Sequence, residues 1–129
     1  MIDHVGWLVR DLDAGVARVT QAVGAEVDRT VDRPQWSLFG YYVGTLEVFT
    51  FTDPELLDER LGDTNTHAKL DHVAYAVDDI DAAMNRLPDA RFSGPDLREE
   101  AREPFELGNA RHIWTVVDGL GLQLLQYTA

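Results

Sequence analysis

The sequence has no cysteine among its 129 residues. This absence excludes disulfides, thiol nucleophiles and thiolate metal ligands, although it says nothing about the compartment. The sequence also lacks the run of about 18 apolar residues that a membrane span requires. It lacks a basic stretch followed by an apolar one, which would mark a secretory signal. We therefore expect a cytoplasmic chain that is not embedded in a membrane.

Basic side chains are scarce. Eleven Lys and Arg residues stand against 23 Asp and Glu residues, which gives a formal net charge of −12. A negative chain repels nucleic acids and anionic membrane surfaces, so neither is expected as a partner. The length suits one ordinary domain with a real hydrophobic core. The partner that remains to be expected is a small molecule.

An internal repeat organises the chain. The triplet Asp3-His4-Val5 recurs as Asp71-His72-Val73 at an offset of 68 residues, and an Asp-x-Asp-Ala pattern follows at 11–14 and again at 79–82. A shared strand or helix signal would reproduce hydrophobic spacing, but it would not reproduce these polar residues. We interpret the chain as a structural duplication. Halves of roughly 65 residues are small for independent domains, so we expect them to form one domain.

Each half is predicted to contain a strand, a helix and three further strands. In the first half these are a strand at 2–9, a helix from the cap Asp11 to Gly24, and strands at 26–33, 36–43 and 45–52. A short helical connector begins at Asp53-Pro54 and stops at Gly62. The second half repeats the order with a strand at 69–77, a helix at 79–87, a short strand near 90–93, and strands at 110–117 and 120–127. Residues 93–109 are predicted to form a mobile loop.

The closing strands of the two halves also align, now at an offset of 76 residues. Residues 45–51 lie over 121–127, which makes Glu47 and Gln123 equivalent positions. Together with His4 and His72 they form a pseudo-symmetric set of four polar residues.

The paired modules resemble the vicinal oxygen chelate superfamily, which includes glyoxalase I, methylmalonyl-CoA epimerase, extradiol dioxygenases, and the bleomycin and fosfomycin resistance proteins. The resemblance implies an α+β fold of two tandem βαβββ modules that form a cupped, mostly antiparallel sheet. Module 1 would span 1–53, the connector 54–68 and module 2 69–129, all within a single domain. The connector and the segment 76–84 look most like methylmalonyl-CoA epimerase. We predict a homodimer, because proteins of this family usually pair their modules edge to edge and because open sheet edges need to be covered.

The resemblance also implies a metal site. It places His4, Glu47, His72 and Gln123 around one divalent ion, with Zn, Ni, Co, Mn and Fe all compatible with such ligands. Open positions on the ion would leave room for two substrate oxygens. The epimerases carry these ligands in the order His, Gln, His, Glu, whereas this chain has His, Glu, His, Gln. Under the internal two-fold symmetry the two orders describe the same constellation.

Strand alternation predicts which side chains share the face of these ligands. Some of these residues could equally belong to the hydrophobic core. The candidates for a substrate pocket are Trp36, Leu38, Tyr42, Phe49, Trp114 and Leu125.

Two functions from different classes remain open. The first is a metal-dependent lyase or isomerase that removes a proton beside a carbonyl group and stabilises the resulting enolate, with Glu47 as the base and His112 as the alternative. The second is a protein without catalytic activity that binds or sequesters a flat aromatic compound, as the drug-resistance members do. Retention of all four polar residues favours the enzyme.

Overall fold

The computed structural model describes residues 1–95 and 97–128, and the chain divides into two compact units. The first unit is His4–Asp71. The second unit combines Met1–Asp3 with the chain from His72 onward. None of the helices in residues 1–95 and 97–128 combines the length and the hydrophobicity of a membrane-spanning segment.

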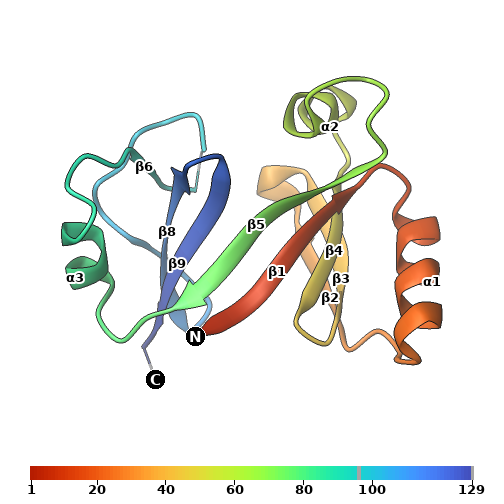
Figure 1. The fold of residues 1–129 in the computed structure, drawn as a ribbon, viewed down its shortest axis with the longest axis horizontal. Coiled ribbons are helices and arrows are strands. Elements are labelled where there is room, and N and C mark those ends of the chain that lie inside the picture. The colour runs from red at the N-terminus through yellow and green to blue at the C-terminus, as the bar shows by residue number, and fades with distance from the viewer. Residues whose placement is uncertain (96, 129) are drawn as a thin grey trace. The chain divides into compact units, whose positions relative to one another are not determined.

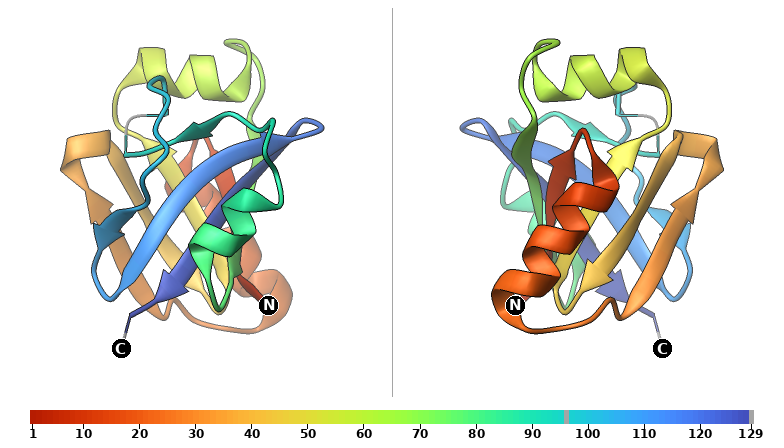
Figure 2. Two further views of the ribbon diagram at one scale, coloured as in Figure 1. Left: turned by 90° about the vertical axis from the view of Figure 1, so that its left-hand side faces the viewer. Right: turned by 90° about the vertical axis from the view of Figure 1, so that its right-hand side faces the viewer.

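The first unit contains a mixed sheet and helices (Figure 1). Its strand order is β2-β3-β4-β1, in which β1 and β4 run parallel and the other neighbours are antiparallel. Helix α1 packs against β3 and β4, as the right-hand view of Figure 2 shows. The elements are β1 (Ile2–Val9), α1 (Leu12–Val23), β2 (Arg29–Arg33), the 3-10 helix η1 (Pro34–Trp36), β3 (Leu38–Val43), β4 (Leu46–Phe51) and α2 (Pro54–Leu61).

Capping residues set the ends of both helices in this unit. The Asp11 carboxylate accepts a hydrogen bond from the backbone N–H of Ala14, and Gly24 ends α1 in the left-handed conformation with φ 67°. Asp53 caps α2 in the same way, and Gly62 ends it. These four positions are the ones that the sequence predicted, and both helices are confirmed.

The core of the first unit lies between β1, β4 and α2. Leu8, Phe49 and Phe51 from the strands are buried together with Leu57 and Leu61 from α2. Alternation along β1 gives Leu8 the same face as His4. The polar end of this sheet face therefore borders directly on apolar core.

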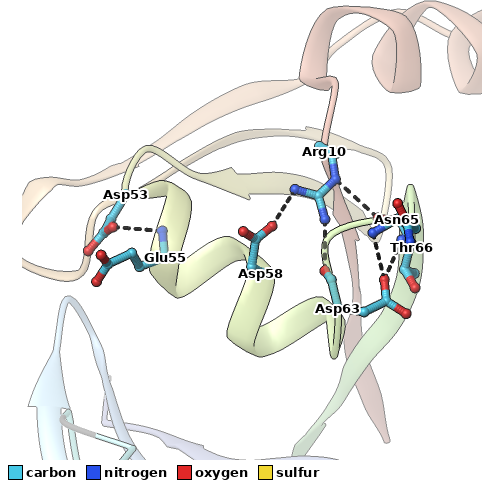
Figure 3. A network of polar contacts seen from close by, with 7 residues as sticks. All are labelled: Arg10, Asp53, Glu55, Asp58, Asp63, Asn65 and Thr66. Carbon is cyan, nitrogen blue, oxygen red and sulfur yellow. Dashed lines mark hydrogen bonds and ion pairs between the residues drawn. The ribbon is translucent and has the colours of Figure 1, made fainter.

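Arg10 secures the segment that follows α2 (Figure 3). Its guanidinium donates to Asp58 at 2.6 Å, to the Thr66 carbonyl at 3.1 Å and to the Asp63 carbonyl at 3.1 Å. The Asp63 carboxylate accepts from the backbone N–H groups of Asn65 and Thr66. Hydrogen bonds from the Thr66 side chain, then from these two backbone groups, lower the pKa of Asp63 below its usual range. The segment is thus a hydrogen-bonded turn.

The second unit repeats the plan. Its strand order is β5-β9-β8-β6, with β5 parallel to β9, and β7 also pairs with β8. Helix α3 packs against β9 (Figure 2, left). The elements are β5 (Ala68–Ala76), α3 (Ile80–Asn85), β6 (Phe92–Ser93), β7 (Phe105–Leu107), β8 (Ala110–Val117) and β9 (Leu120–Tyr127). Asp118 and Gly119 both have positive φ, as the predicted two-residue hairpin turn requires.

The structure corrects several predicted boundaries. The strand expected at 36–43 begins only at Leu38, because Trp36 belongs to η1 and Ser37 turns the chain with φ 54°. The strand expected from residue 26 begins at Arg29, and the helix expected to reach 87 ends at Asn85. The segment 93–109 was wrongly predicted as loop throughout, since it contains β7; its residue 96 lies outside the described residues.

Candidate metal centre

In the first unit, His4 and Glu47 lie on neighbouring parallel strands. Gly6 of β1 is the register partner of Glu47 of β4, and His4 precedes Gly6 by two residues. Because side chains alternate along a strand, His4 and Glu47 share one face of the sheet. Both are buried, with exposed fractions of 7% and 6%. Their candidate ligand atoms lie within 4.8 Å of each other, which is close enough for both to bind one ion.

Tyr42 and Arg29 continue this face across the sheet. Tyr42 pairs directly with Glu47, and its ring meets that of His4 edge to face at 5.6 Å. Arg29 pairs with Tyr42, and its guanidinium carbon lies 4.0 Å from the Tyr42 ring centroid. A row of paired residues thus carries a cation, a phenol and a carboxylate. Sequence reasoning placed Tyr42 here but missed Arg29, which the register of the β2–β3 hairpin would have identified.

In the second unit, His72 and Gln123 have the equivalent relationship. Ala74 of β5 is the register partner of Gln123 of β9, and His72 precedes Ala74 by two residues. His72 and Gln123 are both 5% exposed. Trp114, which pairs with Gln123, meets the His72 ring edge to face at 5.3 Å. The structure therefore reproduces the predicted equivalence of the two His-plus-Glu/Gln pairs.

The Gln123 amide has a fixed orientation. Its Nε2 lies 2.8 Å from Nδ1 of His112. Its Oε1 is buried and has no hydrogen-bond partner among the residues that the structure describes. A buried carbonyl oxygen without a partner costs about 1–3 kcal/mol, so its presence suggests a ligand.

His112 is itself held by β7. Its Nε2 lies 3.3 Å from the carbonyl oxygen of Leu107, and its ring stacks on Phe105 with centroids 5.6 Å apart and an interplanar angle of 27°. The imidazole is 9% exposed. Sequence reasoning missed these contacts because β7 was not predicted.

The candidate pocket residues occupy different surroundings. Phe49 and Leu125 are 1% and 2% exposed and pack in apolar clusters, and Leu38 packs against the cluster that contains Phe49. Tyr42 and Trp114 instead contact the two histidines. Trp36 is partly buried in η1 and does not follow the strand alternation used to place it. The pocket role of all six residues stays a prediction.

The donor atoms fit a divalent metal. His4 and Glu47 in the first unit, and His72 in the second, are buried and carry atoms of the kind that bind metal ions. Imidazole nitrogen and carboxylate oxygen suit Zn, Ni, Co, Mn or Fe, and the buried Gln123 Oε1 is also an oxygen atom that can bind a metal.

A comparison with known protein families shows the family of this chain. The model of the glyoxalase/bleomycin resistance protein/dioxygenase superfamily matches residues 3–105. The chain belongs to this superfamily. The resemblance to vicinal oxygen chelate proteins that the sequence motifs suggested is thereby confirmed. No curated protein sequence matches the chain.

Several solved structures share the fold of this chain. Methylmalonyl-CoA epimerase from Mycobacterium tuberculosis matches with a TM-score of 0.76 at 15% identity, over 99% of this chain and 88% of the epimerase. A variant of the Streptomyces coelicolor methylmalonyl-CoA epimerase, in complex with 2-nitronate-propionyl-CoA, matches with a TM-score of 0.73 at 21% identity, over 99% of this chain and 97% of the epimerase. A hypothetical protein, BH1468 from Bacillus halodurans, also scores 0.73 at 11% identity, over 100% of this chain and 95% of that protein. At these identities the likeness establishes the glyoxalase-like fold.

Proposed function

We propose that this protein is a metal-dependent isomerase that moves a proton on a carbon beside a carbonyl group. The observation that carries the proposal is the matched pair of buried sites, each with a histidine on the opening strand and a Glu or Gln on the closing strand of its unit. His4, Glu47, His72 and Gln123 would hold one divalent metal. When bound, such a metal supplies Lewis-acid stabilisation of negative charge on the carbonyl oxygen.

Glu47 would act as the base. Its carboxylate would take the proton from the carbon, and the C–H electron pair would pass into the enolate. Return of the proton from Glu47 to the carbon would complete a proton exchange without any other reactant, whereas inversion of the centre would need a proton donor on the opposite face of the enolate. Tyr42 is the register partner of Glu47, and its ring contacts that of His4, so the carboxylate would lie on a face that also carries an imidazole and a phenol. The epimerase structures with the same fold support an acyl thioester as the first substrate class to test.

The first experiment is a metal analysis of protein purified without chelator. We expect about one equivalent of divalent metal per chain, and loss of stoichiometric metal in His4→Ala and in His72→Ala, because the remaining donors cannot complete the coordination. Circular dichroism checks that both variants fold. Full occupancy in either folded variant would contradict the site.

The second experiment tests the chemistry. The metal-loaded protein is incubated in deuterated water with acyl-CoA esters that carry an α-hydrogen, and mass spectrometry follows deuterium uptake at that carbon. Hemithioacetal adducts of α-keto aldehydes serve as the comparison, since they are the glyoxalase-type substrates. Uptake only with the second class would change the proposal from an epimerase-like isomerase to a glyoxalase-like lyase.

A binding protein without catalysis is the second candidate. Trp114, partly exposed beside His72, provides an aromatic surface that could stack on a flat ligand. Protein that carries no metal and binds an aromatic compound tightly would favour this function.

We also propose a homodimer, as predicted from the family's pairing of modules. Light scattering across a hundredfold concentration range should give a dimeric mass; a monomeric mass throughout would contradict it.

A further inference from the structure

The orientation of its terminal group matters for Gln123 as a metal ligand but not for Glu47. Both oxygens of a carboxylate can bind a metal, so Glu47 serves as a ligand in either orientation of its terminal group. A carboxamide has one oxygen that can bind and an NH₂ group that cannot. A half-turn of the Gln123 amide would therefore replace a donor atom with a group that repels the ion.

The contacts of His112 remove this ambiguity. The Leu107 carbonyl oxygen can only accept a hydrogen bond, so the ring nitrogen facing it, Nε2, carries the proton. In the neutral ring Nδ1 then holds a lone pair and accepts from the Gln123 NH₂ group at 2.8 Å. With Nε2 of the amide committed in this way, its Oε1 is the atom left without a hydrogen-bond partner among the described residues.

The two units differ at the position that His112 occupies in the second unit. His112 pairs with Leu125 in the second unit, and Gly40 pairs with Phe49 in the first. Leu125 and Phe49 each lie two residues after the Gln or Glu, so His112 and Gly40 are structural equivalents. The unit with a carboxylate has no side chain at this position, whereas the unit with an amide has an imidazole.

We infer that His112 is a positioning residue, which orients the Gln123 amide so that its oxygen is presented as the metal ligand. This inference rests on the proposed metal site. Strand β7 takes part, because Leu107 fixes the tautomer and Phe105 fixes the plane of the ring.

The test is a set of metal titrations on apoprotein with Co²⁺ or Zn²⁺. His112→Phe should weaken binding about 10–100-fold when residue 123 is Gln, the range typical of lost outer-shell partners. In the Gln123→Glu background the same change should weaken binding less than about threefold, because a carboxylate needs no orientation. His112→Asn, whose Oδ1 can accept from the amide, should retain most of the affinity.

Nuclear magnetic resonance supplies a readout that needs no metal. In apoprotein labelled with ¹⁵N, a scalar coupling should be detectable across the hydrogen bond between Gln123 Nε2 and His112 Nδ1. Absence of that coupling, with the His112 ring protonated on Nδ1, would overturn the inference even if His112→Phe fails to fold.

The outcomes separate the two proposals. Native protein that binds no metal overturns both. Native protein that binds metal, combined with equal losses from His112→Phe in both backgrounds, overturns the inference alone and assigns His112 to the stability of the fold.

Discussion

Gly40→Ala should destabilise the first unit strongly. A Cβ atom on Gly40 would lie 2.3 Å from the Val48 carbonyl oxygen and 2.7 Å from the Phe49 Cα. Both are backbone atoms of β4, so no side chain can rotate away to relieve the contact. To bring the new Cβ and the Val48 carbonyl oxygen to even 3.0 Å, which is still a tight contact, β3 and β4 must move apart by about 0.7 Å. This movement lengthens the hydrogen bonds between the two strands.

The expected loss of unfolding free energy is at least about 2 kcal/mol, toward the upper part of the range for overpacking. For a chain of this size that corresponds to a fall in Tm on the order of 8 °C. Urea denaturation followed by tryptophan fluorescence and by circular dichroism measures the change.

Gly94→Ala is the matched control. A Cβ there would meet the Ala101 Cβ at 3.4 Å and Phe105 at 4.0 Å, which are ordinary contacts, and Gly94 is not among the residues with positive φ. This variant should match the native stability or gain about 0.4–1 kcal/mol through the entropy of the unfolded chain. Equal stability of the two variants would refute the argument from close strand approach.

Two further predictions concern the proposed metal ligands, and a third concerns the turn at Asp63. Glu47→Gln should abolish deuterium exchange and retain part of the metal, because an amide still coordinates weakly but cannot accept a proton at neutral pH; Gln123→Glu should tighten metal binding with a modest effect on rate. Exchange that persists in Glu47→Gln with metal bound would place the base elsewhere. The pKa of Asp63 is lowered, first of all by a hydrogen bond from the Thr66 side chain. Ionised Asp63 therefore stabilises the fold at any pH above the ordinary Asp pKa of about 3.9. This contribution is lost as the pH falls through the lower pKa that Asp63 has in the folded protein. A carboxyl ¹³C titration of the native protein and of Thr66→Val measures the shift, and an identical pKa in both would contradict the assigned cause.

The elements with local end signals were predictable from sequence. Asp11 and Gly24 bound α1, and Asp53 and Gly62 bound α2, because capping depends on residues within one turn of each helix end. The turn at Asp118-Gly119 predicted that Trp114 shares a face with Gln123, and the β8–β9 register, in which the two residues pair, agrees with this.

The errors have non-local causes. Strand β7 forms through pairing with β8, and its three residues carry no periodicity that could reveal it. Trp36 lies next to Ser37, whose left-handed conformation breaks the alternation that placed the tryptophan on the ligand face. Alternation also assigned Phe49 to a face without showing that leucines of α2 cover it. The hydrogen bond that orients Gln123 could not be predicted, since it depends on how β7 holds His112.

Contacts within each unit join residues of both sequence repeats. In the second unit, Ala76 donates its N–H to the Met1 carbonyl at 2.8 Å, and the Tyr127 hydroxyl donates to Asp3. The first unit in turn contains Asp71. Each of its two carboxylate oxygens accepts a hydrogen bond from Arg60 Nη2 at 2.7 Å. Each unit therefore includes the start of the other repeat's opening strand. A single repeat contains only one partner of each of these contacts. Expression of either repeat alone should accordingly give a fragment that folds only on self-association or with its complement.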